Sequence, residues 1–423
     1  MDRKKKLAII GSGISGLSAA YFLKDKYNIT VYEKNAVFGG HSRTIPIVDN
    51  KKLKVYVDTG FIVLNDRTYP LLNKLLKDLE VDIEDTEMSF AVSANDGQLE
   101  WAGSSLDTLF AQRKNFLNIK MLRGVLDIIK FNTKAKDLIK ESPNLSLGEL
   151  IKTMNLGSWF RDYYILPMGG AIWSCPSSTM LSFPATTFVS FFDNHGLLSL
   201  KNRPQWHTIK NKSREYVKAL VISISKNNTL KKNCNIEYVD CLDSKIQIKE
   251  YEEDPDVYDE VLFACHPVEI LSVLKSINPA MQNALKKFSR EKNIAYTHFD
   301  SEQMPKEKKC WSSWNYLYRK GEESSRVAVT YWMNKLQHIS LKTPLFVTLN
   351  PVSPVAKEKI YDTHEFYHPV FNQDAIDGQL ALQEIQGDRH VWFCGAYLRY
   401  GFHEDGVWSA AEVSKRIIKR DIS

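Results

Sequence analysis

A glycine-rich turn near the amino terminus carries the strongest chemical signal in the sequence. Gly11, Gly13 and Gly16 form a GxGxxG pattern directly after the apolar residues 7–10. In such a turn the first glycine allows a tight bend, the second lets the backbone approach a pyrophosphate, and the third allows close packing of helix on strand. The first N–H groups of the following helix attract the diphosphate. The pattern therefore predicts a dinucleotide site.

An acidic residue follows the turn at the expected distance. Residues 17–23 carry apolar side chains at helical spacing, and residues 28–33, NITVYE, have a strand pattern. Glu33 ends this second strand, 22 residues after Gly11, where its carboxylate can accept hydrogen bonds from ribose hydroxyls. Its charge repels a 2′-phosphate. Together these segments predict a βαβ unit.

Further small and basic residues follow on the same edge of the predicted sheet. Gly39 and Gly40, in VFGGHSRT, let the chain pass close to a cofactor that lies across the sheet edge. Arg43 can then pair with phosphate or flavin oxygens, although an ordinary surface arginine would look the same. Thr59 and Gly60 form another strand end of small residues on this edge.

Aromatic residues are the main candidates for substrate contact. Trp314 and Tyr316 alternate at strand spacing, and Tyr400 and His403 follow a glycine, Gly395, near the carboxyl terminus. Aromatic walls can align a substrate, and an imidazole can carry a proton near neutral pH. Ordinary core packing and a structural histidine explain the same residues equally well. We therefore treat these four side chains as candidate catalytic contacts and assign no catalytic base.

The elements that must position these residues suggest a divided chain. The 423 residues, 43% of them hydrophobic, are enough for two to three packed domains. Helical patterns dominate residues 105–194, where Ser146 and Glu149 form a capping box. Strand patterns return at 236–265 and 294–349, and a last helix is predicted over 406–420. The two ends therefore form one α/β unit that the middle of the chain interrupts.

Charge and cysteine usage exclude several classes of protein. The formal net charge of +6 is spread over the whole chain, whereas nucleic-acid binders concentrate it, so we expect no nucleic-acid partner. The six cysteines have no CxxC or zinc-type spacing, which predicts free thiols and no metal site. No stretch of 18 apolar residues is present. We expect a cytoplasmic protein, with peripheral attachment to the inner membrane face left open.

One amphipathic segment bears on that last question. Residues 116–131, FLNIKMLRGVLDIIKF, carry apolar residues at helical spacing with Lys120, Arg123 and Lys130 on a polar face. Such a helix can lie on a membrane interface and admit a lipid. It can also pack against a substrate domain. The sequence does not decide between the two.

The glycine turn, the Gly39–Gly40 pair and the carboxyl-terminal string FCGAYLRYGFHEDGVWSAAEV resemble the flavin-containing amine oxidase and phytoene desaturase superfamily. Middle strings such as IWSCP, FPATTFVSFFDNHGLL and CWSSWNYLY are similar to a bacterial branch of predicted NAD/FAD-binding proteins, often encoded beside enzymes that resemble cyclopropane-fatty-acid synthases. One departure is Asn211 and Lys212, where such proteins usually carry two glycines. It puts in doubt how closely the backbone approaches a ligand there.

The resemblance implies noncovalent FAD held by two distant segments. The start of the last helix, near Gly406, would then meet the flavin, and we expect the carboxylates of Glu404 and Asp405 to face backbone N–H groups. The motif and the resemblance together imply these cofactor residues: Gly11, Gly13, Ile14, Ser15, Gly16, Glu33, Lys34, Gly39, Gly40, His41, Ser42, Arg43, Thr59, Gly60, Phe61, Gly395, Ala396, Glu404, Asp405, Gly406 and Val407.

The resemblance also implies an α/β fold of the two-dinucleotide-binding-domain flavoprotein type. Its Rossmann-like FAD-binding domain would comprise residues 1–75, 205–270 and 360–423. An inserted α+β substrate domain of mixed sheet and helices would comprise residues 76–204 and 271–359.

The activity that the resemblance implies is that of an FAD-dependent oxidoreductase. It would remove hydride from a C–H bond of an apolar, fatty-acyl or lipid substrate. Three alternatives stay open: an amine oxidase that makes imine and hydrogen peroxide, a redox-neutral isomerase, and a noncatalytic flavin- or lipid-binding partner. A cyclopropane-fatty-acid-synthase-like methyltransferase is the candidate functional partner.

Overall fold

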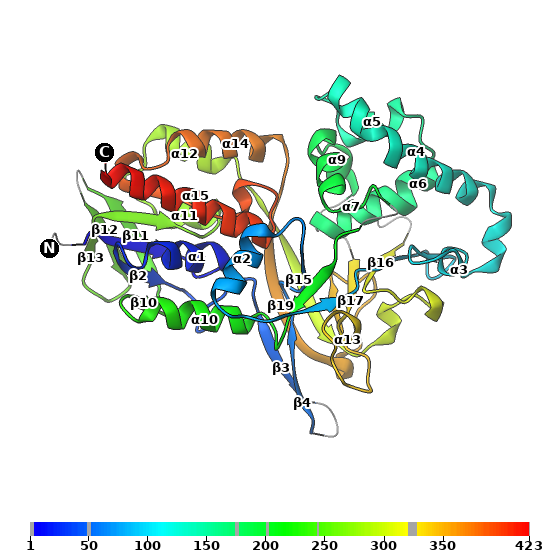
Figure 1. Cartoon of the computed structure of the whole chain (residues 1–423), viewed down its shortest axis with the longest axis horizontal. Helices are drawn as coiled ribbons and strands as arrows, with labels where there is room; N and C mark the ends of the chain where they lie inside the picture. Colours follow the sequence, from blue (N-terminus) through cyan, green and yellow to red (C-terminus); the bar gives the residue numbers. More distant parts are fainter. Residues whose placement is uncertain are drawn as a thin grey trace.

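The computed structural model describes residues 4–48, 52–173, 177–199, 203–242, 245–319 and 328–422. Cys175, one of the predicted free thiols, lies outside these ranges. Figure 1 shows the two ends of the chain side by side in one half of the molecule and residues 90–194 in the other. This arrangement places two sheets in separate halves, which are described in turn.

The first half contains a parallel sheet. Its described strands follow the order β10-β2-β1-β14-β20, and every neighbouring pair is parallel. The carboxyl ends of all these strands therefore lie at one edge. The bounds are β1 (Lys6–Ile10), β2 (Asn28–Tyr32), β10 (Thr229–Lys231), β14 (Glu260–Phe263) and β20 (Val391–Phe393).

Both faces of this sheet are covered, which explains why its strands are almost wholly apolar. Leu7 and Ile9 point into a core shared with helices on one face, whereas Ala8 and Ile10 point into a core on the other. The first face packs against α1 (Ile14–Leu23), α2 (Pro70–Asp78), α10 (Arg214–Ser225) and α15 (His403–Ile422). The second packs against β11 (Ile236–Cys241), β12 (Ile246–Glu250), β13 (Asp256–Tyr258), α11 (Pro267–Val273), α12 (Pro279–Lys286) and α14 (Gln373–Glu384).

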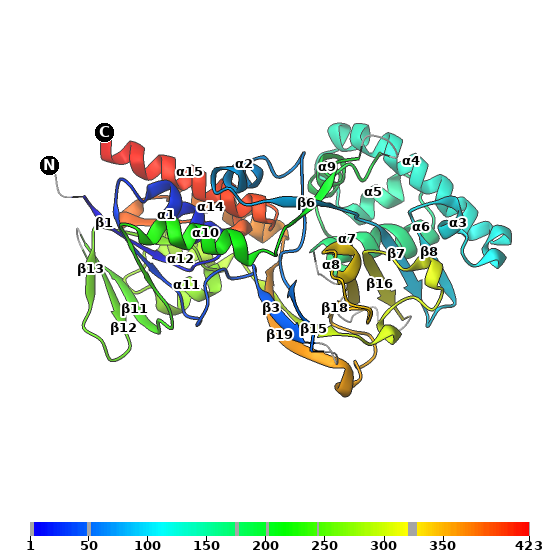
Figure 2. The same cartoon turned by 60° about the horizontal axis from the view of Figure 1, so that its bottom comes forward.

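The second half contains a mixed sheet with helices on one side, as Figure 2 shows. The order is β19-β15-β18-β17-β16-β7-β8, and only β16 and β7 run parallel. The strands are β7 (Phe90–Ala94), β8 (Leu99–Ala102), β15 (Arg290–His298), β16 (Trp314–Tyr318), β17 (Ala328–Trp332), β18 (Phe346–Leu349) and β19 (Ile360–Pro369). The helices are α4 (Ile119–Glu141), α5 (Leu147–Thr153), α6 (Ser158–Phe160), α7 (Leu166–Trp173), α8 (Ser177–Leu181) and α9 (Ala185–Asn194).

Smaller elements join the halves. A hairpin of β3 (Thr44–Val48) and β4 (Lys54–Asp58) projects from the molecule in Figure 1. A short sheet joins β5 (Leu64–Asn65), β9 (Trp206–Ile209) and β6 (Ile83–Thr86). Short helical segments also form at α3 (Leu106–Leu109), η1 (Arg113–Leu117) and α13 (Met333–Leu336).

The predicted fold class is confirmed, including the helical segment inserted into an α/β unit. The capping box also forms, because Ser146 Oγ accepts from the Glu149 N–H and the Glu149 carboxylate accepts from the Ser146 N–H. The last helix begins at His403, three residues before the predicted start. The domain boundaries remain a prediction; β19 pairs with β15, and α12 packs beside α14. No helix in the described ranges combines the length and apolar character needed to cross a bilayer.

Candidate functional site

One large cavity is lined by described residues from both halves. It runs from Gly13 at the carboxyl edge of the parallel sheet to Ile128 and Trp173 in the helices over the mixed sheet, and its volume is about 2120 Å³. Cavities that hold one small ligand measure about 300–1,000 Å³. This cavity therefore has room for a dinucleotide and a second molecule.

One end of the cavity, the nucleotide end, is formed by the carboxyl edge of the parallel sheet. Gly11 follows β1, Glu33 follows β2, Ala264 follows β14 and Gly395 follows Cys394 after β20, and all four line the cavity. Ligands of open parallel sheets bind at this edge. The segments named in the sequence thus meet although more than 380 residues separate the first from the last.

The glycine turn has the geometry that its pattern predicts. Gly11 adopts φ +104°, and a Cβ at Gly16 would lie 1.9 Å from the Gly11 carbonyl oxygen, so the predicted bend and close packing are confirmed. A Cβ at Gly13 would meet nothing within 4 Å. Among the described residues no side chain caps α1, and Ile14 and Ser15 in its first turn line the cavity. The open space and the uncapped helix start suit a diphosphate.

Glu33 is buried beside this turn with its carboxylate fixed. One oxygen accepts from the Ser12 N–H at 3.1 Å and from Ser12 Oγ at 2.5 Å. The other accepts from the Asn35 N–H at 2.8 Å and from Asn35 Nδ2 at 2.7 Å. A buried carboxylate held this way is a ready acceptor for ribose hydroxyls, and neighbouring Lys34 is paired with Glu269 at 2.5 Å.

Arg43 lines the cavity, but its guanidinium is already engaged. Two of its nitrogens donate to the two oxygens of Asp362 at 2.9 and 3.1 Å. This bidentate pair holds the arginine against β19 in the other half of the molecule. The predicted pairing of Arg43 with phosphate or flavin oxygens would have to share the guanidinium with Asp362.

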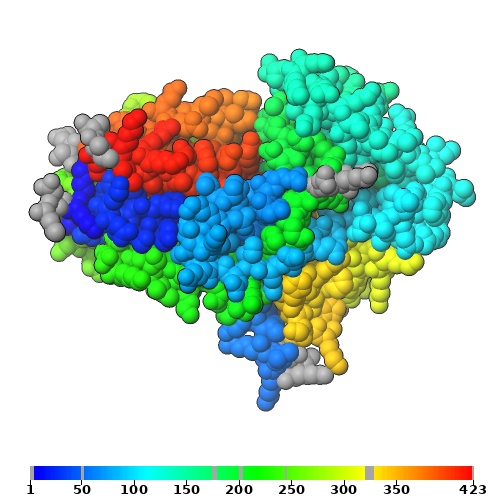
Figure 3. Space-filling view, in the orientation of Figure 1, coloured from blue at the N-terminus to red at the C-terminus, as the bar shows by residue number. Residues whose placement is uncertain are grey.

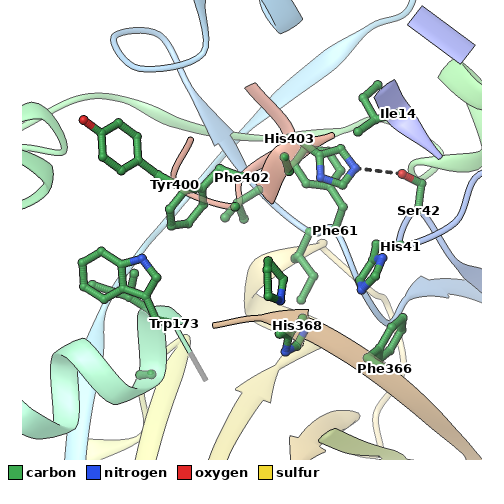
Figure 4. A pocket seen from close by; sticks show the side chains of 18 of the residues that line it. Ile14, His41, Ser42, Phe61, Trp173, Phe366, His368, Tyr400, Phe402 and His403 are labelled. Carbon is green, nitrogen blue, oxygen red and sulfur yellow. Dashed lines mark hydrogen bonds between the residues drawn. The ribbon is translucent and has the colours of Figure 1, made fainter. Parts of the chain in front are cut away.

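Neutral histidines form the cavity wall beyond the glycine turn. His403 Nε2 lies 2.9 Å from Ser42 Oγ, which also contacts the Tyr216 hydroxyl, and the imidazole stacks on Phe61 at 3.8 Å between ring centres (Figure 4). Desolvation deep in the molecule lowers the pKa of His403 to about 3. His403 is therefore uncharged at neutral pH and acts as a hydrogen-bonding group rather than as the proton carrier considered from the sequence.

A second group of rings joins His41, one of the predicted cofactor residues, to Phe366 and His368. The His41 ring lies 5.2 Å from that of Phe366 and 5.6 Å from that of His368. Desolvation lowers the pKa of His41, and it lowers that of His368 to about 3. Because His368 lies on β19, only the tertiary fold brings it to His41.

Two carboxylates at the start of α15, those of Glu404 and Asp405, accept hydrogen bonds from backbone N–H groups. The Glu404 carboxylate accepts from the Leu71 and Leu72 N–H groups at 3.0 and 2.9 Å, and Asp405 accepts from the Phe402 N–H at 3.0 Å. Both carboxylates face backbone N–H groups, as expected, but Glu404 caps α2 rather than α15. Burial raises the pKa of Asp405 to about 6.

Several predicted cofactor residues lie behind the cavity wall. A Cβ at Gly406 would lie 2.7 Å from Ile14 Cγ2, so this glycine lets α15 pack closely on α1. The predicted residues that line the cavity are Gly11, Gly13, Ile14, Ser15, Glu33, Lys34, Gly40, His41, Ser42, Arg43, Thr59, Gly60, Phe61, Gly395 and Ala396. Those that do not are Gly16, Gly39, Glu404, Asp405, Gly406 and Val407.

The opposite end of the cavity, the substrate end, is apolar and aromatic. Figure 4 places Ile14 and Ser42 on one side of the pocket and Trp173, Tyr400 and Phe402 on the other. Of the candidate catalytic contacts, Trp314 and Tyr400 line this cavity, as His403 does, whereas Tyr316 is buried in the core. Further lining residues are Trp101, Leu109, Val125, Ile128, Tyr164, Met168, Ile172, Phe191, Leu197, Tyr331 and Phe371.

Charged groups at the substrate end are few. Glu87 is paired with Lys335 at 2.9 Å, and His195 stacks on Phe191 at 3.8 Å, with its pKa lowered to about 4 by desolvation. Arg203 donates to the Ser199 carbonyl at 3.1 Å and makes no ion pair with any described residue. Among the described residues at this end, the exposed Arg203 is therefore the cation without a carboxylate partner.

The structure also places two features outside the cavity lining. His298 is fully buried away from the cavity, where its Nε2 lies 2.7 Å from Thr348 Oγ1. Asn211 and Lys212 adopt φ values of 62° and 83°. These are conformations that favour glycine, although neither residue is a glycine. The turn does not line the cavity.

Comparison with known families gives one match, to the NAD(P)-binding Rossmann-like domain over residues 9–79. A curated relative, coproporphyrinogen III oxidase from Staphylococcus aureus (strain NCTC 8325 / PS 47), is 28% identical over 200 residues. That match covers 43% of this chain and 39% of the relative. The chain thus matches less than half the length of this relative.

Solved structures match over the whole chain. The conjugated-linoleic-acid-producing fatty acid isomerase from P. acnes has a TM-score of 0.69 at 11% identity, covering 99% of both chains. Cyclohexylamine oxidase from Brevibacterium oxydans IH-35A has a TM-score of 0.63 at 12% identity, covering 98% of this chain and 100% of that one. At these identities the likeness shows a shared fold.

Proposed function

We propose that this chain, which has the fold of the flavin-containing amine oxidase and desaturase superfamily, is an FAD-dependent oxidoreductase acting on an apolar acyl or lipid substrate. The observation that carries the proposal is the single cavity that joins a dinucleotide cradle to an aromatic, apolar chamber. A dinucleotide seated at one end would reach the chamber without leaving the cavity.

The residues at the nucleotide end suit FAD held without a covalent bond. The open position at Gly13 and the uncapped start of α1 would hold the diphosphate, and Glu33 would bind ribose. The described cysteines that line the cavity are Cys234 and Cys265, and burial raises the pKa of both thiols, which makes them poor nucleophiles. When bound, the flavin would supply the redox chemistry: it would take up the hydride from one C–H bond and the proton lost from the adjacent carbon, so that one flavin is reduced by two electrons for each double bond formed.

The protein would orient the substrate and exclude water from the reacting carbon rather than act as an acid or a base. Apolar and aromatic walls orient an acyl chain and exclude water from the reacting carbon. His403 and His41 are neutral because desolvation lowers the pKa of each. They can hold hydrogen bonds at fixed positions without adding charge to the chamber. Such a site suits removal of hydride from a carbon chain.

The charges around the cavity favour an acidic lipid over a cationic amine. Among the described residues, the lining carboxylates all have polar or cationic partners: Glu33 with Ser12 and Asn35, Glu87 with Lys335, Glu269 with Lys34, and Glu365 with Lys292. Arg203, in contrast, has no described carboxylate partner. An unpaired cation attracts a carboxylate or phosphate headgroup and repels an ammonium group.

The test is anaerobic reduction of the purified, flavin-loaded chain. Fatty acids or phospholipids should bleach the visible flavin band, whereas polyamines and aromatic amines should not. Replacing Arg203 with leucine should raise the KM for a free fatty acid about tenfold and leave flavin content unchanged; Arg203→Lys should retain much of the affinity. Bleaching by amines alone, with peroxide released in air, would establish the amine oxidase alternative instead.

A redox-neutral isomerisation is the second candidate, and the full-length fold match to a fatty acid isomerase favours it. In that reaction hydride leaves one carbon and returns to another carbon of the same substrate. The two proposals differ in stoichiometry. Isomerisation converts many equivalents of fatty acid without an electron acceptor, whereas dehydrogenation stops after one equivalent per flavin unless an acceptor is supplied.

A further inference from the structure

The helices farthest from both termini expose an unusual number of apolar side chains. They are α3, η1 and the first part of α4, which Figure 3 shows in cyan at the outer end of the molecule. Leu117 is 87% exposed, Ile119 80% and Leu106 76%. We call the following residues the outer helical patch: Leu106, Phe116, Leu117, Ile119, Leu122, Leu126 and Ile129.

The patch follows one face of α4. Ile119, Leu122 and Leu126 are exposed at helical spacing, whereas Met121 and Phe131 on another face are fully buried in the core. One face of this segment therefore packs in the core, whereas another face is exposed. Contiguous exposed apolar surface of this kind marks an interaction site.

Positive charge surrounds the patch. Residues 105–134 contain six basic residues and two acidic ones. Lys114, Lys120 and Lys134 are exposed and form no ion pair with a described residue, whereas Arg123 lies 4.0 Å from Asp127. A second copy of the same patch would be repelled by this charge, but an anionic surface would be attracted.

The patch is continuous with the cavity. Leu106 and Ile129 are exposed members of the patch and also line the cavity, and α4 contributes Val125, Ile128 and Asn132 to the same lining. The substrate end of the cavity thus reaches the molecular surface within the patch. An apolar molecule could pass from this surface to the chamber without crossing a charged rim.

We propose that the outer helical patch docks on a bilayer that contains anionic lipid, and that acyl chains enter the cavity through it. Apolar side chains would enter the interface while the surrounding lysines meet the headgroups. The docking half of this inference is independent of the chemistry. The entry half rests on the proposed function.

Sedimentation of the full-length, flavin-loaded protein with vesicles tests docking. The protein should bind vesicles of phosphatidylglycerol and phosphatidylcholine, and bind vesicles of phosphatidylcholine alone more weakly. The variant Leu117→Ser/Ile119→Ser should reduce the partition constant about tenfold, because two exposed apolar side chains are lost. The control is Ile222→Ser/Leu380→Ser, which removes apolar side chains that are 52% and 59% exposed on α10 and α14 and should bind like the unmodified chain.

Charge gives a second pair of variants. Lys114→Glu/Lys120→Glu should abolish the preference for anionic vesicles, whereas Lys218→Glu/Lys226→Glu, at exposed positions on or beside α10, should retain it. The docking proposal is overturned if the unmodified chain ignores anionic vesicles or if both members of either pair behave alike. Loss of a concentration-dependent dimer in Leu117→Ser/Ile119→Ser, without any vesicle binding, would instead assign the patch to self-association.

A different measurement tests the proposed chemistry independently of docking. Anaerobic flavin bleaching by fatty acid in detergent micelles does not need a bilayer, so it should survive in the patch variants. Vesicle binding with no bleaching by any lipid would leave docking intact and overturn the proposed function. Bleaching that is equally fast from vesicles in Leu117→Ser/Ile119→Ser and in the unmodified chain would refute entry through the patch.

Discussion

The two ends of the cavity are built in opposite ways. The nucleotide end consists largely of turns close together in the sequence, at residues 11–16 and 33–43, placed by one edge of a parallel sheet. The substrate end collects single side chains from segments between Glu87 and Phe402. A backbone-based cradle depends on a few local conformations, whereas an apolar chamber depends on how helices pack over a sheet.

The two ends of the cavity also differ in how many hydrogen bonds their polar groups make within the protein. At the nucleotide end Glu33 and Arg43 are each held by several hydrogen bonds. At the substrate end the wall is mostly hydrocarbon and aromatic ring, and Arg203 has no described carboxylate partner. The first end is organised to fix one ligand in one pose. The second resembles sites in which chain length and shape determine what binds.

The sharpest way to separate the two ends is Gly13→Val. Gly13 has φ −67° and ψ −177°, which any residue adopts, and its Cβ position is empty. The variant should therefore fold normally and fill the space for a diphosphate, so we expect FAD affinity to fall at least about a hundredfold. Flavin absorbance of the purified protein and titration with FAD measure the change. Lipid binding at the other end should persist.

Gly11→Val is the contrasting variant. Gly11 has φ +104°, and a Cβ there would lie 2.9 Å from the Ala264 carbonyl oxygen. Loss of flavin in this variant should come with loss of thermal stability, because the backbone itself is strained. If Gly13→Val stays yellow at full occupancy, the diphosphate does not lie against this turn.

Behind the wall of the nucleotide end lies a buried carboxylate whose ionisation is costly. Burial raises the pKa of Asp405 to about 6 from an ordinary value of 3.8. A raised carboxyl pKa means that folding favours the protonated form, so this contribution to stability is present at low pH and is lost as pH rises from about 4 through about 6. Asp405→Asn should stabilise the chain by about 2 kcal/mol at pH 8.

Denaturant unfolding at several pH values measures this effect. The gain should shrink below pH 6 and vanish near pH 4, where the aspartate is protonated in both states. The matched control is Glu412→Gln. The Glu412 carboxylate is partly exposed on the same helix and pairs with Lys415, so the stability of this variant should not show the same dependence on pH. A gain in Asp405→Asn that is independent of pH would rule out ionisation as its cause.

At the substrate end, Val125→Trp should shorten the chamber. Val125 lines the cavity from α4 and is partly exposed, so a larger ring can extend into open space. If the chamber holds an acyl chain, affinity for long-chain fatty acids should fall about tenfold while that for short chains changes little. Equilibrium dialysis with fatty acids of increasing length measures this. Flavin content should not change, and equal loss at all lengths would argue against a chamber that measures chain length.

The sequence predicts the nucleotide end far better than the substrate end, for a physical reason. Gly11, Gly16 and Glu33 act through local backbone geometry and spacing, which a linear pattern records. Trp101 and Trp173 line the chamber, yet in the sequence they cannot be told from core residues, because a cavity wall and a core are both apolar. The fold class follows from periodicity, whereas the sheet to which β19 belongs depends on pairing across nearly 70 residues.

The same limit explains the residues that were placed differently. Glu404 caps α2 because α2 packs beside α15, a contact between segments more than 320 residues apart. His403 is a poor proton carrier because of desolvation, which no spacing reveals. Arg43 meets Asp362 through the same kind of distant pairing. In each case the residue type was informative, but its partner was set by tertiary structure.

The smallest expected effect concerns the turn between the two ends, where Asn211 adopts φ 62° without a glycine. Asn211→Gly should relieve this conformation and raise stability by about 0.5 kcal/mol, since asparagine already tolerates it better than most residues. Thermal unfolding at neutral pH would show the gain. Asn227→Gly, at a turn with ordinary φ after α10, should destabilise because glycine only adds freedom to the unfolded chain. Neither variant should alter flavin or lipid binding, because Asn211 does not line the cavity. A change in either affinity with Asn211→Gly would mean that this turn, rather than the cavity walls alone, couples the two ends.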